Sequence, residues 1–120
     1  MSICFGLLYV KFRHHQKSFN EKFQLEKQHG VIRAKKIRIR LAELKAALSL
    51  KDFWPPKSKP SRCHELTEGR RAGQLSVDLD HPYRLIFVPD HNPIPRLGDG
   101  GLDWSQVTAI KIMGVEDTHE

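Results

Sequence analysis

The apolar residues of this 120-residue chain change their spacing once, at Trp54-Pro55-Pro56. Before this break, from Val31 onward, apolar side chains recur at intervals of three and four, which is the repeat of one buried helix face. After it, Leu75, Val77 and Leu79 alternate with polar residues, as in a half-buried strand. Proline lacks a backbone donor and disfavours helix in the residue before it, so the break ends the helical part.

The first half of the chain predicts a strand and two helices. Ile3–Phe12 is rich in Phe, Leu, Tyr and Val with little alternation, which is typical of a strand covered on both faces. Ser18-Phe-Asn-Glu21 has the capping-box spacing that begins a helix, and Gly30 is suited to end it in the left-handed conformation. A second helix follows from Val31, and its core-facing stripe is Ala34, Ile37, Leu41, Leu44 and Leu48.

The second half predicts strands, turns and one long loop. In chain order these are a short strand at Cys63–Leu66, a hairpin of Leu75–Leu79 and Tyr83–Val88 around Asp80-His81-Pro82, a loop over Pro89–Ser105 and a last strand at Val107–Met113. Strands that follow helices predict an α+β domain of order β-α-α-β-β-β, with two N-terminal helices packed on one face of a small, mainly antiparallel sheet. We expect the opposite face of the sheet to be open and to hold the functional site.

Composition excludes several classes of protein. With 39% hydrophobic residues arranged in blocks, the chain is not a disordered polyelectrolyte. Its longest apolar run, Ile3–Val10, is far shorter than the roughly 20 residues of a membrane-spanning helix, and it lacks the flanks of a signal peptide. Cys4 and Cys63 are too few for a disulfide scaffold. We therefore expect a single domain over residues 1–120, located in the cytoplasm and without a membrane partner.

Charge is distributed unevenly along the chain. Residues 1–62 hold fifteen Lys and Arg against four Asp and Glu, whereas residues 63–120 hold five against ten, so the formal net charge of +6 combines +11 and −5. A basic excess of this size predicts a polyanion or an acidic protein as partner. Arg33, Lys36 and Arg40 share one side of the second helix and are candidate phosphate contacts. The plain alternative is that they form a solvated helix face.

Arginines in the second half are further candidates for binding phosphate. Arg84 stands just after a turn in an otherwise apolar strand, where its planar guanidinium would bind two phosphate oxygens. The plain alternative is a surface arginine paired with Asp78 or Asp80 across the hairpin. Arg70 and Arg71 lie between two glycines, either in a loop that closes over an anion or in a solvated turn.

Two histidines, His64 and His119, stand at the edges of predicted strands. Cleavage of RNA by its own 2′-hydroxyl needs a base for that hydroxyl, cations for the phosphorane and an acid for the leaving oxygen. Histidine titrates near neutrality and serves either proton-transfer role, although a lone histidine is more often structural. A zinc site is not expected, because Cys63 is adjacent to His64 and His14-His15 lack companions at ligand spacing.

Three segments in the same order resemble the RelE/ParE superfamily of bacterial toxins, in particular its HigB-like branch of killer proteins. His64-Glu-Leu66 with Gly69-Arg-Arg-Ala-Gly73 and Ser76 is similar to a His-x-Leu, Gly-Asp-Arg-x-Gly and Ser block. Tyr83-Arg-Leu-Ile-Phe87 is similar to the aromatic-Arg-hydrophobic strand, and Glu116-Asp-Thr-His119 to a C-terminal Glu-Asp-Tyr-His. The resemblance covers roughly residues 18–119.

The resemblance implies a RelE-like fold and a ribosome-dependent endoribonuclease that cuts messenger RNA in the decoding site without a metal or other cofactor. It also implies a HigA-like helix-turn-helix antitoxin as partner, in a toxin–antitoxin hetero-oligomer. His64, Arg84, Asp117 and His119 fall on catalytic positions of the family, with the two histidines sharing proton transfer and positioning, Arg84 stabilising the phosphorane and Asp117 orienting or assisting. Arg71 falls on a further phosphate contact.

The sequence departs from the family at several positions. Thr118 replaces the tyrosine of the C-terminal motif, and the loop over Pro89–Ser105 is longer than in minimal toxins. Two alternatives therefore stay open beside the RNA endonuclease. One is a ParE-like inhibitor of DNA gyrase, for which His64 and His119 have no obvious purpose. The other is a catalytically decayed toxin that is retained as an antitoxin- or RNA-binding module.

Overall fold

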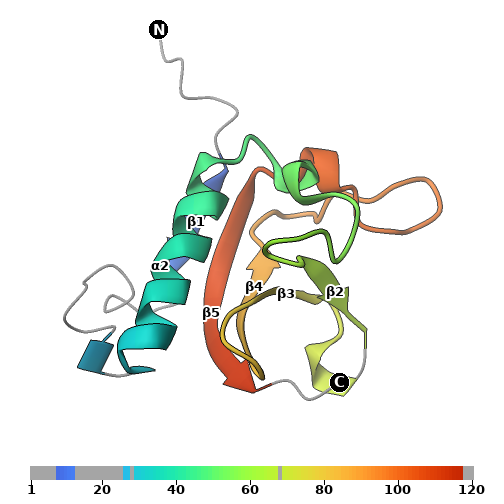
Figure 1. Cartoon of the computed structure of the whole chain (residues 1–120). Coiled ribbons are helices and arrows are strands. Elements are labelled where there is room, and N and C mark those ends of the chain that lie inside the picture. Colours follow the sequence, from blue (N-terminus) through green and yellow to red (C-terminus); the bar gives the residue numbers. More distant parts are fainter. Residues whose placement is uncertain (1–7, 13–25, 28, 68, 118–120) are drawn as a thin grey trace, which may run out of the picture.

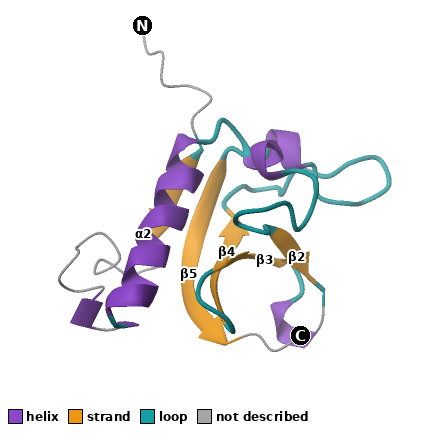
Figure 2. Ribbon diagram, viewed as in Figure 1, coloured by secondary structure: helices purple, strands orange, loops and turns teal. Residues whose placement is uncertain are grey.

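The fold is a five-stranded sheet with one long helix packed on it, in a computed structural model that describes residues 8–12, 26–27, 29–67 and 69–117. The helix α2 (Val31–Ala46) lies along one face of the sheet, as Figures 1 and 2 show. This arrangement confirms the predicted α+β class. The predicted first helix and its capping box fall on residues outside the described ranges, apart from residues 26, 27 and 29, which are helical.

Helix α2 begins after Gly30, whose φ of 83° requires the left-handed region that glycine adopts without a steric penalty. The amide of Gly30 still donates to the Glu26 carbonyl, so the glycine both ends one helical stretch and begins the next. Four residues of the predicted stripe are buried as expected: Ala34, Ile37, Leu41 and Leu44. The fifth, Leu48, is 57% exposed because the helix ends at Ala46 and the chain turns, which buries Ala47 instead.

The sheet has the strand order β1-β5-β4-β3-β2. Its strands are β1 (Tyr9–Phe12), β2 (His64–Leu66), β3 (Gln74–Asp78), β4 (Tyr83–Pro89) and β5 (Ala109–Asp117). Strand β1 runs parallel to β5, and the other neighbours are antiparallel, so the predicted mainly antiparallel sheet is confirmed. The predicted hairpin is β3 and β4, in which Asp78 lies opposite Arg84.

The core lies between α2 and the facing side of the sheet. Its fully buried side chains include Ile37 and Leu44 from α2, Leu75 from β3, Phe87 from β4 and Ile112 from β5. Burial of such side chains away from water is the main favourable term that holds the two layers together.

Strand β5 bends sharply, because Ile86 pairs with Gly114 while the next residue, Phe87, pairs with Ile112. Met113 is therefore the extra residue of a bulge, which increases the local twist. Figure 1 shows the curved end of β5 near the short 3₁₀ helix η3 (Gly69–Arg71), which follows β2 at the far edge of the sheet. The curvature brings the end of β5 toward the β2 edge of the sheet, where Arg71 and Glu116 meet.

Two other short 3₁₀ helices pack together near the opposite end of the sheet: η2 (Leu50–Phe53) and η4 (Trp104–Gln106). The predicted long loop before the last strand is present, and it contains η4 and an isolated bridge between Arg96 and Leu102. Among the described residues, no helix combines the length and apolar character needed to span a bilayer.

Candidate functional site

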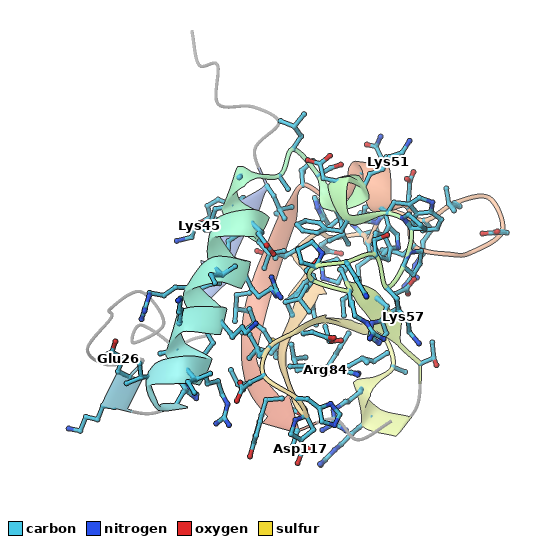
Figure 3. All side chains as sticks on the ribbon, in the orientation of Figure 1. Glu26, Lys45, Lys51, Lys57, Arg84 and Asp117 are labelled. Atoms are coloured by element: carbon cyan, nitrogen blue, oxygen red, sulfur yellow. The ribbon has the colours of Figure 1, made fainter. Side chains whose placement is uncertain are left out.

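Charged residues gather on the sheet face that points away from α2. Side chains alternate along a strand, so Asp78 and Arg84 face the side opposite to the core residues Val77 and Leu85. The register places Glu116 of β5 on the other side of Arg84. Strand pairing therefore gives a row of alternating charge across three strands, which Figure 3 locates by its labelled Arg84.

Arg84 is held by Asp78. Its Nε atom lies 3.2 Å from an Asp78 carboxylate oxygen, and its side chain is only 14% exposed. The plain alternative of a cross-hairpin ion pair is thus confirmed for Asp78, although Arg84 is not the exposed residue which that alternative assumed. The Arg84 guanidinium is thus held in a fixed orientation by the Asp78 carboxylate.

Asp78 is shared with a second guanidinium. The Nε atom of Arg62 lies 3.5 Å from the other carboxylate oxygen. Arg62 adopts a φ of 52°, which is uncommon for a residue with a Cβ, at the end of the turn before β2. Two arginines from separate segments therefore bracket one carboxylate. Guanidinium groups suit phosphate as well as carboxylate, and in this structure the carboxylate of Asp78 is their anion.

His64 begins β2 directly opposite Ser76, on the same face of the sheet. Its Nδ1 atom is 2.9 Å from the carbonyl oxygen of Arg62. A carbonyl only accepts, so Nδ1 carries the hydrogen and, in the neutral ring, Nε2 carries the lone pair. This is the tautomer in which Nε2 acts as a base. Both His64 and Ser76 are buried, with the Ser76 hydroxyl lacking a hydrogen-bond partner among the described residues.

Arg71 connects the β2 edge of this face to the inner strand β5. From η3, after the edge strand β2, its Nε and Nη2 atoms reach one oxygen of Glu116 on β5 at 2.9 and 2.5 Å. Because β3 and β4 lie between β2 and β5, this ion pair spans the middle of the sheet. We call the Arg71–Glu116 pair the clasp.

The prediction that the sheet face opposite α2 is open to solvent is therefore wrong at the centre of the sheet. Ser76 and Ile86, which point away from α2, are fully buried, and His64 is 6% exposed. The curvature of β5 and the clasp explain this, because they bring η3 and the end of β5 close together. The predicted alternation of exposed and buried residues along β3 fails for the same reason.

The basic residues predicted on the helix have different surroundings. Arg40 is only 7% exposed; it donates to the carbonyls of Asp78 and Pro60 at 2.7 and 3.2 Å and pairs with Glu43 at 3.1 Å. The expectation of a solvent-facing phosphate contact is wrong for Arg40, because its guanidinium joins the helix to the hairpin and the preceding turn. Lys36 is half-buried and makes no ion pair within the described residues.

Arg33, about two turns earlier on α2, has the same joining role. Its Nε atom lies 3.0 and 3.3 Å from the two Asp80 oxygens, and its guanidinium stacks 3.6 Å above the Tyr83 ring. Beside this group, burial and the neighbouring Arg33 charge lower the pKa of His29, while Asp80 opposes them. Arg33 therefore faces the hairpin turn, where it already has an anion and an aromatic partner.

The remaining predicted residues lie at the chain's C-terminal side and on η3. Asp117 ends β5 opposite Tyr83, so by strand alternation it lies on the face of Tyr83, whereas Glu116, one residue earlier, lies on the face of Arg84. His119 and Thr118 fall outside the described residues, so the expected grouping of His119 with His64 stays a prediction. Arg70 is exposed on η3 beside Arg71. Arg62 and Glu116 stand in or beside the motif segments but were not predicted as site residues, because the turn before β2 and the register of β5 are what bring them to their partners.

Cys63 is adjacent to His64 in sequence but is fully buried in the core. Burial, aided by the charge of Glu65, raises the pKa of its thiol, which keeps the sulfur protonated and poorly nucleophilic. No group of three or more metal-ligating side chains occurs within the described part of the chain.

Comparison with known proteins gives matches at the level of structure. No family model matches the chain, and neither does any curated protein. The structure is similar to a chain of the YoeB–YefM complex from Staphylococcus aureus, with 18% identity over 94% of this chain and 98% of that chain and a TM-score of 0.48. It is also similar to the YoeB dimer from Staphylococcus aureus, with 18% identity, the same coverage of both chains and a TM-score of 0.47.

Proposed function

We propose that this chain is the toxin of a type II toxin–antitoxin pair, of the HigB-like kind, and that it cuts messenger RNA on the ribosome. The observation that carries the proposal is the grouping of His64 with Arg62, Arg71 and Arg84 on one face of the sheet. It unites a proton-transfer group with cations suited to a phosphate. Two of the three sequence segments that resemble RelE/ParE toxins supply His64, Arg71 and Arg84 independently of this geometry.

The proposed reaction is attack of an RNA 2′-oxygen on the adjacent phosphorus. The new 2′-O–P bond forms while the P–O5′ bond breaks, which leaves a 2′,3′-cyclic phosphate and a 5′-hydroxyl. One histidine accepts the proton of the 2′-hydroxyl and the other donates a proton to the 5′-oxygen, with His64 and His119 sharing these roles. Arg84 stabilises the extra negative charge of the phosphorane. The orienting or assisting role of Asp117, at the end of β5, rests on the sequence resemblance alone, because strand alternation places it on the face of Tyr83.

Binding of RNA at this face requires two contacts to exchange. The phosphate takes the position of the Asp78 carboxylate between Arg62 and Arg84, and the clasp opens to admit the strand to His64. In both exchanges an RNA phosphate replaces a carboxylate as the partner of an arginine. Arg62, Arg71 and Arg84 therefore keep an anionic partner throughout. The segment that moves is η3, and Gly73 bounds it with a φ of 89°.

A partner follows from the same proposal. A toxin of this kind is neutralised by a HigA-like helix-turn-helix antitoxin in a hetero-oligomer, and it acts in the cytoplasm, where ribosomes and messages are found. The basic surface of the chain supplies the long-range attraction toward ribosomal RNA, and such binding weakens steeply with salt.

The test is induction of the chain in bacteria without its partner, with growth measured and RNA 5′ ends mapped on translated and untranslated messages. We expect growth arrest and cuts at codon positions on translated messages. His119→Ala should lower cutting by about 10²-fold or more. The matched control is His81→Ala, which removes an exposed turn histidine and should leave cutting unchanged.

Three outcomes would contradict the proposal. DNA double-strand breaks without RNA cuts would indicate a gyrase inhibitor. Absence of both arrest and cuts would indicate a binding module that has lost activity. Full activity of His119→Ala would remove His119 from the site.

A further inference from the structure

A hollow of about 310 Å³ lies at the end of the sheet opposite Asp117. It is formed between η2 and the loop that contains η4, and Figure 3 shows Lys51 at this end. The residues that line it are Lys51, Trp54, Leu97, Leu102, Asp103, Trp104 and Ser105. The hollow shares no residue with the arginine face, the clasp or His64.

An exposed aromatic ring forms one wall of the hollow. Trp54 is 55% exposed, although tryptophan is usually covered in a small domain. It meets Trp104 edge to face with ring centroids 5.1 Å apart, and Trp104 is only 4% exposed in the core. The buried ring therefore supports the exposed one, which presents an ordered flat surface to solvent.

Several cations either line the hollow or lie near its lining residues in the chain. Lys51 lines the hollow, Lys57 and Lys59 follow Trp54 in the chain, and Arg96 precedes the lining residue Leu97. Lys51 and Lys57 lie on the same side of the molecule in Figure 3. All four are exposed, and none of them is ion-paired within the part of the chain that the structure describes.

The nearby carboxylates are directed to the backbone instead. Asp52 accepts from the Leu48 amide at 2.9 Å, and Asp99 accepts from the Gly101 amide at 2.8 Å. Asp103 accepts from the amide and hydroxyl of Ser105 at 3.2 and 2.6 Å. These acids cap local turns and keep their negative charge, so the cations and the indole are the side chains able to contact a phosphate and a base.

We propose that the hollow binds single-stranded RNA, with a base stacked on Trp54 and the flanking phosphates contacted by Lys51 and the lysines at 57 and 59. An aromatic face beside cations is how proteins bind single strands without reading sequence. A purely apolar peptide anchor would leave the four cations without partners, whereas a nucleic-acid strand brings one phosphate with every nucleotide. This site goes beyond the proposed cleavage, because it binds RNA whether or not the chain cuts it.

The experiment measures binding of a fluorescein-labelled ten-nucleotide oligouridine to the purified full chain without ribosomes. All variants are made on a His119→Ala background so that no cleavage interferes. Because Trp54 and Trp104 are the two tryptophans of the chain, quenching of tryptophan fluorescence reports stacking in the same titration.

We expect Trp54→Ala to weaken binding about tenfold and abolish the quenching, while Trp54→Phe, which keeps a ring, stays within about threefold of the parent. Lys51→Ala should weaken binding a few-fold and lower the salt slope by about one. The charge-matched control is Lys35→Ala on the exposed side of α2, which should leave affinity and quenching unchanged.

Equal affinity of Trp54→Ala and the parent would overturn the proposal, as would an equal loss in Lys35→Ala. Trp54-dependent binding of an acidic peptide, with no binding of oligouridine, would assign the hollow to a protein partner instead. If Trp54→Ala fails to show the circular dichroism spectrum of the parent, Lys51→Ala with Lys57→Ala provides the decisive comparison. None of these results depends on RNA cleavage.

Discussion

The arginine face and the tryptophan hollow use positive charge in opposite ways. On the arginine face Arg62, Arg71 and Arg84 each pair with a carboxylate, and the Arg84 side chain is 14% exposed. Around the hollow, Lys51 and Lys57 are exposed and unpaired within the described residues. The arginine face is preorganised for one anion. The tryptophan hollow instead offers the general electrostatic attraction of exposed lysines and the aromatic ring of Trp54.

This difference shows that net charge in sequence does not measure the charge available to a partner. Residues 1–62 carry a formal +11, but Arg33 and Arg40 from that half are committed to Asp80 and to the hairpin backbone. Arginine suits such inner contacts because its fork satisfies several acceptors at fixed angles, whereas lysine keeps its strongly hydrated head in water.

The largest expected effect tests whether Arg40 is internal. Arg40→Ala leaves the carbonyls of Asp78 and Pro60 without their donor, so it should lower the free energy of unfolding by about 2 to 4 kcal/mol. Lys35→Ala, on the exposed side of the same helix, should change it by less than about 0.5 kcal/mol. Urea unfolding followed by circular dichroism measures both changes in the free energy of unfolding. Equal changes for the two variants would show that the contacts of Arg40 do not stabilise the fold.

The next effect tests whether Asp78 fills an anion site. Asp78→Asn keeps the shape but removes the charge between Arg62 and Arg84, so we expect a loss of about 1 to 2 kcal/mol in the free energy of unfolding. Inorganic phosphate should then raise the melting temperature of this variant more than that of the parent. Asp99→Asn, in an exposed loop, serves as the control. A phosphate response no larger than that of the control would argue against the site.

A smaller effect is expected for the clasp. Glu116→Gln removes an ion pair whose side chains are 34% and 44% exposed, so stability should fall by no more than about 0.5 kcal/mol. The local consequence should be larger, because η3 loses its link to β5. Hydrogen exchange of the amides at 69–73 should accelerate, while exchange in β3 and β4 stays unchanged. Unaltered exchange at 69–73 would show that the clasp does not hold this segment.

The smallest effect concerns pH. The pKa of His29 is lowered in the folded chain, so the unfolded chain binds more protons as pH falls through the usual value near 6.5. Folding stability contributed by neutral His29 is therefore present at pH 7.5 and decreases toward pH 5.5. His29→Gln should make that decrease smaller, as thermal unfolding at the two values would show. If the variant and the parent lose the same stability between pH 7.5 and pH 5.5, His29 does not contribute to the pH dependence of folding.

Much of the fold was predictable because its signals are local. The spacing of Ala34, Ile37, Leu41 and Leu44 predicts the buried side of α2, and the alternation around Leu75 predicts β3. The early end of α2 was missed, because Leu48 continues the pattern in sequence while the chain already turns after Ala46. The burial of Ser76 was missed because it depends on sheet curvature, a tertiary property.

The site was predictable in part. Motif positions predicted His64 and Arg84 as site residues, and the structure places both on one face of the sheet; the hairpin pattern also allowed the Asp78–Arg84 pair to be foreseen. Arg62 joins the site through a turn in the left-handed conformation, and Glu116 through the bulge that bends β5. Neither feature has a clear sequence signal in a single chain. The hollow was not predicted either, because it forms between Trp54 and the loop around Leu97 and Leu102, which lies more than forty residues later in the chain.

We infer that cleavage of RNA and docking of single-stranded RNA are carried out by different regions of this chain. This separation is tested most directly by measuring two quantities on the same two variants: the cleavage rate of a ribosome-bound message at saturating protein, and the affinity for oligouridine. We predict that Arg84→Lys loses cleavage and keeps affinity, while Trp54→Ala loses affinity and keeps the saturated cleavage rate. Loss of both quantities together in either variant, or no cleavage by the parent chain, would contradict the account.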